Sequence, residues 1–328
     1  MPVIQMREAI NQAMCEEMQR DPDVFLIGEE VAEYDGAYKV SQGMLAKFGP
    51  QRVVDAPISE GGFAGLGIGA AMVGMRPIVE FMTFSFSLVC FDQVVNNAPK
   101  MFHMSGGQIN VPIVFRGISG PGQQLAATHS WSVEALYTHV PGLKVVVPTT
   151  PYDAKGLLKT AIRDNDPVIF LENEALYGNR GEVPEGDYTI PFGKADIKRE
   201  GTDCTIIAWG QGCLLALAAA DELEKTNGIS VEVIDPRTLR PLDLDTIIKS
   251  VRKTGYCVTV ETGYPTCGIG AELAALIHEH CFEDLDNHVQ RVASLDVPIP
   301  YSKPMLQEVV PGVGRVIAAV KRAMYVEA

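Results

Sequence analysis

The stretch Asp55-Ala-Pro-Ile-Ser-Glu60-Gly-Gly-Phe-Ala-Gly-Leu-Gly-Ile-Gly-Ala-Ala71 leaves a short apolar run and enters a glycine-rich helical pattern. Ser59 and Glu60 are typical of a helix cap and a first helical turn. An apolar run that passes directly into a helix predicts one step of a parallel α/β sheet. Five glycines stand between residues 61 and 69. Glycine costs about 1 kcal/mol against alanine inside a helix, so we interpret them as sites of close packing.

The same alternation of strand-length apolar runs and helical segments continues on both sides of this stretch. It predicts βαβ units in a mainly parallel sheet that is covered on both faces. The expected strands are Val24–Gly28, Arg52–Asp55, Pro77–Glu80, Val111–Arg116, Lys144–Val147 and Val168–Glu172.

The alternation stops between Tyr177 and Lys194, where glycine, proline and acidic residues predominate as in a linker. We therefore expect a domain boundary near residue 186. After it the alternation resumes and predicts a second, smaller α/β domain. Its expected strands are Thr205–Trp209, Ile229–Ile234 and Tyr256–Glu261, and its expected helices are Leu214–Lys225, Leu244–Lys253 and Gly268–His280.

Composition supports two cores and excludes several functions. The 328 residues are 47% hydrophobic, and the length exceeds what one core usually serves. A net charge of −14 without a basic run argues against nucleic acid as a partner. The seven cysteines form no CxxC pair, so we expect neither disulfides nor a zinc site.

The most apolar stretch, Val79–Val95, contains Glu80 and Asp92 and is shorter than a bilayer span of about 20 residues. We interpret it as a buried element and expect no membrane partner. No targeting peptide is recognisable at the start, which predicts a cytoplasmic protein, or an organellar one in its mature form.

Three residue patterns have both a functional and a structural interpretation. Gly65-x-Gly67-x-x-Ala70 fits the dinucleotide fingerprint, but its glycines lie inside the helix and not in the turn, which argues against a nicotinamide cofactor. Glu60 stands where parallel sheets bind ligands, although a first-turn glutamate is more often only a helix-dipole partner. His129 has the chemistry of a general acid or base, but a lone histidine is usually structural. We interpret His139, before Pro141-Gly142, as structural.

Nine segments in family order, spread over nearly the whole chain, resemble one family. It comprises the beta subunits of thiamine-diphosphate-dependent 2-oxoacid dehydrogenases, and the resemblance is strongest to those that act on pyruvate. The segments are Gly28–Val40, Ile58–Gly65, Glu80–Phe86, Phe91–Asn96, Pro112–Gly117, Pro141–Pro148, Leu171–Glu174, Arg237–Pro241 and Asp296–Tyr301.

The resemblance implies a transketolase-like organisation: a pyrimidine-binding domain over residues 1–185 and a transketolase C-terminal-like α/β domain over residues 186–328. In this family thiamine diphosphate lies between alpha and beta chains, and a Gly-Asp-Gly motif holds its diphosphate and Mg²⁺. This sequence contains no Gly-Asp-Gly. The resemblance therefore implies half a site, completed by an alpha subunit in an alpha2beta2 assembly.

Carried over by position, Glu60 resembles the glutamate that hydrogen-bonds N1' of the cofactor's aminopyrimidine. That role requires a carboxyl that holds a proton, which an apolar wall favours. Ile58, Met82 and Phe86 match the cofactor-contacting positions that would form this wall. His129 resembles an active-site histidine near the substrate and the incoming lipoyl group.

The resemblance also implies a cation site and a docking site. Potassium in the family is bound mainly by main-chain oxygens, which suit a hard cation. In related enzymes the basic subunit-binding domain of the acyltransferase contacts an aspartate and the terminal carboxylate, which match Asp286 and Ala328. The matching potassium positions are Ile113, Ala161, Ile162, Asp164 and Asp166.

Other assignments remain open from the sequence. A branched-chain 2-oxoacid or acetoin dehydrogenase beta subunit is the nearest alternative, although Met82-Thr-Phe-Ser-Phe86 resembles the pyruvate enzymes better. A silent scaffold predicts that Glu60 can be replaced freely. A nicotinamide-dependent dehydrogenase predicts that NAD binds the isolated chain.

Overall fold

The computed structural model describes residues 1–326, and its elements group into two units. The first unit contains Met1–Ser119 and Leu136–Phe192. The second contains Gly120–Ala135 and the chain from Gly193 onward. The boundary that we predict near residue 186 falls shortly before Gly193. The sequence analysis assigned Gly120–Ala135 to the first domain, whereas in the structure this segment belongs to the second unit.

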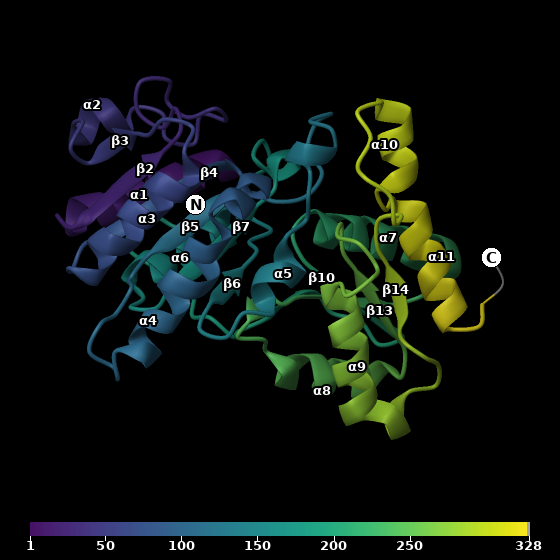
Figure 1. The fold of residues 1–328 in the computed structure, drawn as a ribbon. Helices are drawn as coiled ribbons and strands as arrows, with labels where there is room; N and C mark the ends of the chain where they lie inside the picture. Colours follow the sequence, from purple (N-terminus) through teal and green to yellow (C-terminus); the bar gives the residue numbers. More distant parts are fainter. Residues whose placement is uncertain (327–328) are drawn as a thin grey trace. The chain divides into compact units, whose positions relative to one another are not determined.

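The first unit is built on a parallel sheet with the strand order β6-β7-β5-β4-β2-β3 (Figure 1). The apolar runs form its strands because both faces are covered, as expected for a parallel sheet. Their bounds are β2 Val24–Gly28, β3 Val53–Asp55, β4 Arg76–Thr83, β5 Val114–Ile118, β6 Lys144–Val146 and β7 Val168–Glu172.

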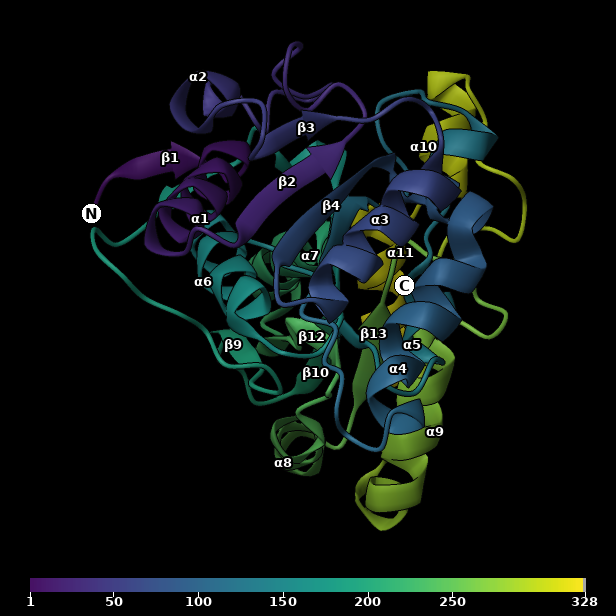
Figure 2. The ribbon, with the colours of Figure 1, turned by 60° about the vertical axis from the view of Figure 1, so that its left-hand side comes forward.

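Helices cover the two faces of this sheet. Helices α1 (Met6–Arg20) and α6 (Pro151–Arg163) pack on each other on one side, and α3 (Glu60–Met72) packs on β4 from the other (Figure 2). Within α3, a Cβ added at Gly67 would come within 2.7 Å of the Val79 side chain, so this glycine permits close packing. The remaining elements of the unit are β1 Val3–Gln5, α2 Met44–Phe48, η1 Phe84–Cys90, η2 Gln93–Asn97, α4 Ala98–Met104, η4 Glu174–Leu176 and β8 Arg180–Glu182.

Strand β5 begins later than the apolar run predicts. Val111 and Ile113 are buried, but the ladder starts only at Val114. Pro112 has no N–H to donate, and proline is excluded from the interior of a central strand. The predicted strand Val111–Arg116 is therefore wrong at its first residues. The apolar stretch Val79–Val95 is the end of β4 followed by η1 and part of η2.

The second unit has a sheet with the order β14-β13-β10-β11-β9, parallel except for the antiparallel edge strand β9. Its strands are β9 Asp196–Arg199, β10 Cys204–Ala208, β11 Val231–Asp235, β13 Cys257–Val260 and β14 Gln290–Val292; β12 spans Thr238–Arg240. Its helices are α7 Gln211–Asn227, α8 Leu244–Thr254, α9 Ile269–Cys281, α10 Lys303–Val309 and α11 Val313–Ala323, with η3 Ala127–His129 and η5 Phe282–Asp284. The short helix α5 spans Glu134–Thr138, where the chain passes between the units.

The core of the second unit lies between the sheet and helices α7 and α11. Small residues of α7, among them Ala216, Ala219 and Ala220, contact Ile206 and Val233 of the strands there. Helices α8 and α9 also contact each other. Within residues 1–326, no helix has the length and apolar character that a bilayer span requires.

Candidate functional site

The candidate site lies at the carboxyl edge of the first sheet, where its strand order reverses. From β2 the chain moves to β3 on one side and then, through α3, to β4 on the other. The crevice outside such a reversal is where open α/β sheets bind ligands. Glu60, the first residue of α3, lies at this edge with only 6% of its surface exposed, so the helix start that we predict is confirmed.

Glu29 is a second acid at this edge, and the sequence analysis did not identify it. It follows β2 directly, is 8% exposed, and its buried Oε1 atom has no hydrogen-bond partner within residues 1–326. Burial, the neighbouring Glu60 carboxyl and, more weakly, Glu80 raise the pKa of Glu29. The two carboxyls therefore lie close enough to interact, and this interaction disfavours the charged form of Glu29. The signal in the sequence was an acid placed immediately after a wholly apolar strand.

Behind this pair a buried ionic network runs through neighbouring strands. Glu80 on β4 and Glu172 on β7 flank Arg116 on β5, whose side chain is 1% exposed. Arg116 donates to both oxygens of Glu172 at 2.6 Å and also to Glu80, and the Tyr177 hydroxyl donates to Glu172 at 2.6 Å. Burial, outweighing the guanidinium, raises the pKa of Glu80. The Arg116 guanidinium thus pairs with two carboxyls.

The three residues expected to form an apolar wall have different environments. Met82 and Phe86 are half-buried on β4 and η1, in the same unit as Glu60. Ile58 is 87% exposed and therefore does not shield Glu60 within this chain. Cys90, at the end of η1, has a pKa raised to about 12 by burial and by the Glu60 charge, which leaves it a neutral thiol.

His129 belongs to the second unit, in the short turn η3. Its imidazole is exposed, and Nδ1 lies 3.0 Å from the Thr128 hydroxyl. Just before η3, Ala126 has φ 65° and ψ −177°, in a region populated essentially by glycine. Such strain persists only where surrounding contacts fix the backbone, and it is common at functional sites.

The residues assigned to potassium already have cationic partners. The carbonyls of Ile162 and Asp164 accept hydrogen bonds from the Arg76 guanidinium at 2.9 and 2.8 Å. Lys144 pairs with the carboxylates of Asp164 and Asp166 at 2.6 and 3.0 Å. In addition, the Ile113 carbonyl accepts from a backbone amide, as does that of Ala161. These contacts engage the expected ligand groups, but a carbonyl oxygen has two lone pairs, so potassium binding at these positions stays a prediction.

The residues at Glu60 do fit the pyrimidine half of thiamine diphosphate. Two buried side-chain oxygens at the ends of neighbouring strands have no hydrogen-bond partner within residues 1–326. They are Thr83 Oγ1, at the end of β4, and Glu29 Oε1, directly after β2. Unsatisfied buried oxygens of this kind are uncommon and frequently mark functional positions. Together with the half-buried Met82 and Phe86, they offer polar and apolar contacts to a flat heterocycle.

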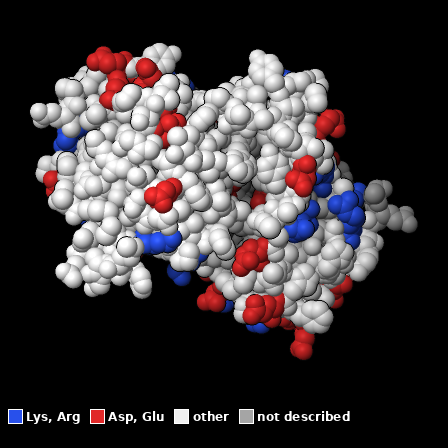
Figure 3. Space-filling view, viewed as in Figure 1, with Lys and Arg blue, Asp and Glu red and all other residues white. Residues whose placement is uncertain are grey.

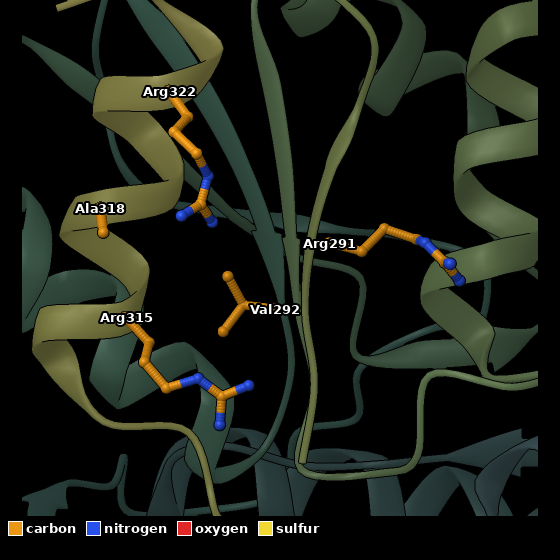
Figure 4. Close-up of a pocket in the computed structure, with 5 residues that line it drawn as sticks. All are labelled: Arg291, Val292, Arg315, Ala318 and Arg322. Atoms are coloured by element: carbon orange, nitrogen blue, oxygen red, sulfur yellow. The ribbon is translucent and has the colours of Figure 1, made fainter. Parts of the chain in front are cut away.

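Two surface cavities share no lining residue with this site. One, of about 450 Å³, is lined by Gly74, Arg76, Asn110 and neighbouring residues of the first unit. The other, of about 140 Å³, is lined by three arginines, Val292 and Ala318 in the second unit. Figure 4 shows two of its arginine side chains, those of Arg315 and Arg322, extending from α11 toward the strand. Neither cavity includes an acid or a histidine, so neither offers a proton-transfer group.

Asp286, assigned to partner docking, is exposed just before β14. Its backbone amide donates to the Gly255 carbonyl at 2.9 Å, and within residues 1–326 no lysine or arginine pairs with its carboxylate. Ala328, the second expected docking residue, lies outside the described residues.

Comparisons with known proteins cover nearly the whole chain. The family model described as "Transketolase, pyrimidine binding domain" matches residues 3–180, and "Transketolase, C-terminal domain" matches residues 193–316. The chain is 54% identical to "Pyruvate dehydrogenase E1 component subunit beta" of Rhizobium meliloti over 99% of its own length and 71% of that protein's. It is 53% identical to the mitochondrial subunit beta of Bos taurus over 98% and 90%.

Among solved structures, the chain is similar to a "Split gene transketolase, inactive beta4 tetramer". The TM-score is 0.80 at 25% sequence identity, and the match covers 99% of each chain. The expected transketolase-like two-domain fold is therefore confirmed.

Proposed function

The chain belongs to the family of pyruvate dehydrogenase E1 component beta subunits, and from this membership we propose that its Glu60 carboxyl is the group that activates thiamine diphosphate. The chain functions as the beta subunit of the component that decarboxylates pyruvate. The relatives share this name across bacteria, plants and animals, which does not support the branched-chain or acetoin alternative. The burial of Glu60 beside Glu29 at the strand reversal carries the proposal.

When bound, thiamine diphosphate supplies the nucleophile for the substrate carbonyl and the ring that stores the electrons when CO2 leaves. The role of Glu60 is to share a proton with N1' of the aminopyrimidine. Its position in the first turn of a helix fixes the backbone, and burial keeps water away from the carboxyl. Burial and the Glu60 charge raise the pKa of Glu29, which favours the neutral form of this neighbouring carboxyl.

An alpha subunit is required because this chain supplies only the pyrimidine half of the site. Exposed residues along one side of α3 and at its C-cap, Val73, support an interface with another chain. Gly62, Leu66, Gly69 and Val73 recur at helical spacing and are all exposed, Leu66 by 57% and Val73 by 82%. The face over α3 carries few charged side chains in the view of Figure 1 (Figure 3). Exposed apolar surface of this kind marks a protein interface.

We propose that the alpha subunit holds the diphosphate and Mg²⁺ in an alpha2beta2 enzyme. This chain alone should neither decarboxylate pyruvate nor bind thiamine diphosphate tightly, because a ligand with half its contacts loses most of its binding free energy. Calorimetry with Mg²⁺, followed by decarboxylation assays on pyruvate and branched 2-oxoacids after adding the alpha chain, measures both. Tight Mg²⁺-dependent binding to the isolated chain would contradict the proposal.

We further propose that a basic subunit-binding domain of the acyltransferase docks at Asp286. Its exposed carboxylate has no cationic partner in the described chain, so an incoming arginine or lysine does not have to displace one. The arginine-lined cavity, by contrast, repels a basic partner and restricts how that partner can orient.

Asp286→Asn should weaken docking by at least about 1 kcal/mol, the lower range for a charge-assisted hydrogen bond. Decarboxylation should be unaffected. Surface plasmon resonance of the assembled enzyme on the acyltransferase domain, over a salt series, measures the change. Asp284→Asn is the matched control, because Asp284 is already paired with Arg252. Equal affinities for the two variants would place the docking site elsewhere.

A further inference from the structure

Glu261 is a buried acid of the second unit that the proposed chemistry does not use. It follows β13 directly and is 5% exposed. Its Oε1 atom accepts a hydrogen bond from the Gly270 amide at 2.8 Å, in the first turn of α9. Burial raises the pKa of Glu261 to about 7; Glu134 adds to this shift, while the amides of Ile269 and Gly270 and the Arg291 charge oppose it.

Three glycines form the walls around this carboxyl. A Cβ added at Gly263 would lie 3.0 Å from its Oε2, and one at Gly268 or Gly270 would lie 2.8 or 2.7 Å from its Oε1. Carbon and oxygen do not approach so closely without a shift of one of them. The carboxyl therefore fills its site completely, and the backbone from 261 to 270 is shaped around it.

The turn after Glu261 is attached to segment Gly120–Ala135. The Thr262 carbonyl accepts hydrogen bonds from the Ser132 hydroxyl at 3.3 Å and from the Ser294 hydroxyl at 2.8 Å. Glu134, in the same segment, is 8% exposed and close enough to affect Glu261 electrostatically. A separate contact, from the Gln124 side chain to the Tyr301 carbonyl at 3.3 Å, attaches the other end of the segment.

These contacts explain how the segment tolerates its strained backbone. Ala126 and Gln124 both have positive φ, 65° and 57°. A free loop would relax to ordinary angles, because non-glycine residues disfavour this region. His129 stands three residues after Ala126, so whatever fixes the segment also fixes the imidazole.

We propose that Glu261 is a positioning residue that fixes segment Gly120–Ala135 and thereby orients His129. The proposal rests on a proposed function of His129, which resembles an active-site histidine of the family: that its imidazole exchanges protons during acetyl transfer to lipoamide. Glu261 acts through the turn at Thr262 and touches neither substrate nor cofactor. Burial and, after it, the Glu134 charge favour the neutral form of Glu261, so ionisation of this carboxyl at higher pH should loosen the turn and the segment attached to it.

The test measures hydrogen exchange of the amides of residues 120–135 in the assembled enzyme. In Glu261→Ala, exchange of this segment should be at least about tenfold faster while α7 keeps its protection. In the native chain, protection corrected for intrinsic exchange should fall between pH 5 and pH 8, because the raised pKa of Glu261 favours the neutral form at the acidic end. Glu261→Gln, which carries no ionisable group, should show protection that is independent of pH over this range.

Asp243→Asn is the matched control. Asp243 is also a buried acid of the second unit, and it accepts hydrogen bonds from the Ala195 and Thr246 amides at the start of α8. Among residues 1–326, none of its side-chain hydrogen bonds joins it to the segment. Its exchange profile over 120–135 should equal that of the native chain. Unchanged protection in Glu261→Ala, or an unchanged pH profile in Glu261→Gln, would overturn the positioning role.

Activity separates this proposal from the role of His129. Glu261→Ala should lower acetyl transfer to lipoamide at least about tenfold relative to decarboxylation with an artificial electron acceptor, as misplaced catalytic groups do, and His129→Ala should do the same. If His129→Ala affects both reactions equally, the role of His129 fails, while the exchange data still decide whether Glu261 fixes the segment. If only Glu261→Ala leaves the ratio unchanged, the positioning proposal fails.

Discussion

Glu60→Gln should lower pyruvate decarboxylation by the assembled enzyme at least about 100-fold, because positioned proton transfer typically contributes a factor of 10² to 10⁴. Glutamine keeps the size and a hydrogen-bonding oxygen but cannot share a proton with N1'. The fold should be retained, because the substitution is nearly isosteric. Helix α3 also has no side-chain capping hydrogen bond at Ser59 that the substitution could disturb. Steady-state decarboxylation with an artificial acceptor measures the loss.

Glu182→Gln is the control for this substitution. Glu182 is an exposed glutamate on β8 of the same unit, away from the carboxyl edge of the sheet, and its loss should leave turnover within about twofold. Near-normal turnover in the assembled Glu60→Gln enzyme would exclude the proposed role of Glu60 and would favour its other interpretation, that of a helix-dipole partner.

Arg116→Met should destabilise the first unit by about 3 to 5 kcal/mol, the usual cost of removing one partner from a buried ion pair. Methionine fills much of the volume, but Glu80 and Glu172 would face each other without a compensating charge. Urea unfolding followed by circular dichroism measures the free energy of unfolding. The deficit should shrink as the pH falls toward 5, because the burial that raises the pKa of Glu80 is no longer opposed by the guanidinium, and a neutral Glu80 carboxyl in the folded variant removes the repulsion.

Arg252→Met is the matched control, because it removes an arginine from an exposed pair with Asp284, with side chains 55% and 40% exposed. Exposed pairs contribute roughly 0 to 1 kcal/mol. If both substitutions cost the same, the network around Arg116 would contribute no more than a surface ion pair.

Strands β2 and β7 have the predicted bounds because each is an unbroken apolar run ending in a polar or glycine residue, and this pattern depends only on local sequence. Helix α8 was likewise predicted within one residue, since Asp243 caps one end and Gly255 ends the other. Strand β5 was predicted too early because apolar character alone does not show that Pro112 cannot join a ladder.

The candidate site was only partly predictable for a related reason. Glu60 is found from its place between a strand and a helix. Glu29 is marked in the sequence only by its place directly after an apolar strand. Its closeness to Glu80 depends on the register of β2 against β4, where Gly28 pairs with Glu80, and register is set by long-range packing. Segment 120–135 is attached by the hydrogen bond from the Ser132 hydroxyl to the Thr262 carbonyl, and no local sequence pattern connects these two residues. The potassium assignment depends on matching positions alone, and it stays a prediction.

The chain crosses between its two units at three places, after residues 119, 135 and 192. A genetic cut at the boundary near residue 192 therefore does not yield two self-sufficient modules. The upstream fragment would carry segment 120–135 without Thr262 and Tyr301, the residues that attach it. If the downstream part were exchanged between two relatives, His129 would come from one protein, and Thr262 and Tyr301, which attach its segment, would come from the other. Recombined chains of this family should thus inherit substrate activation from the upstream parent but acetyl-transfer efficiency from the match between both parents.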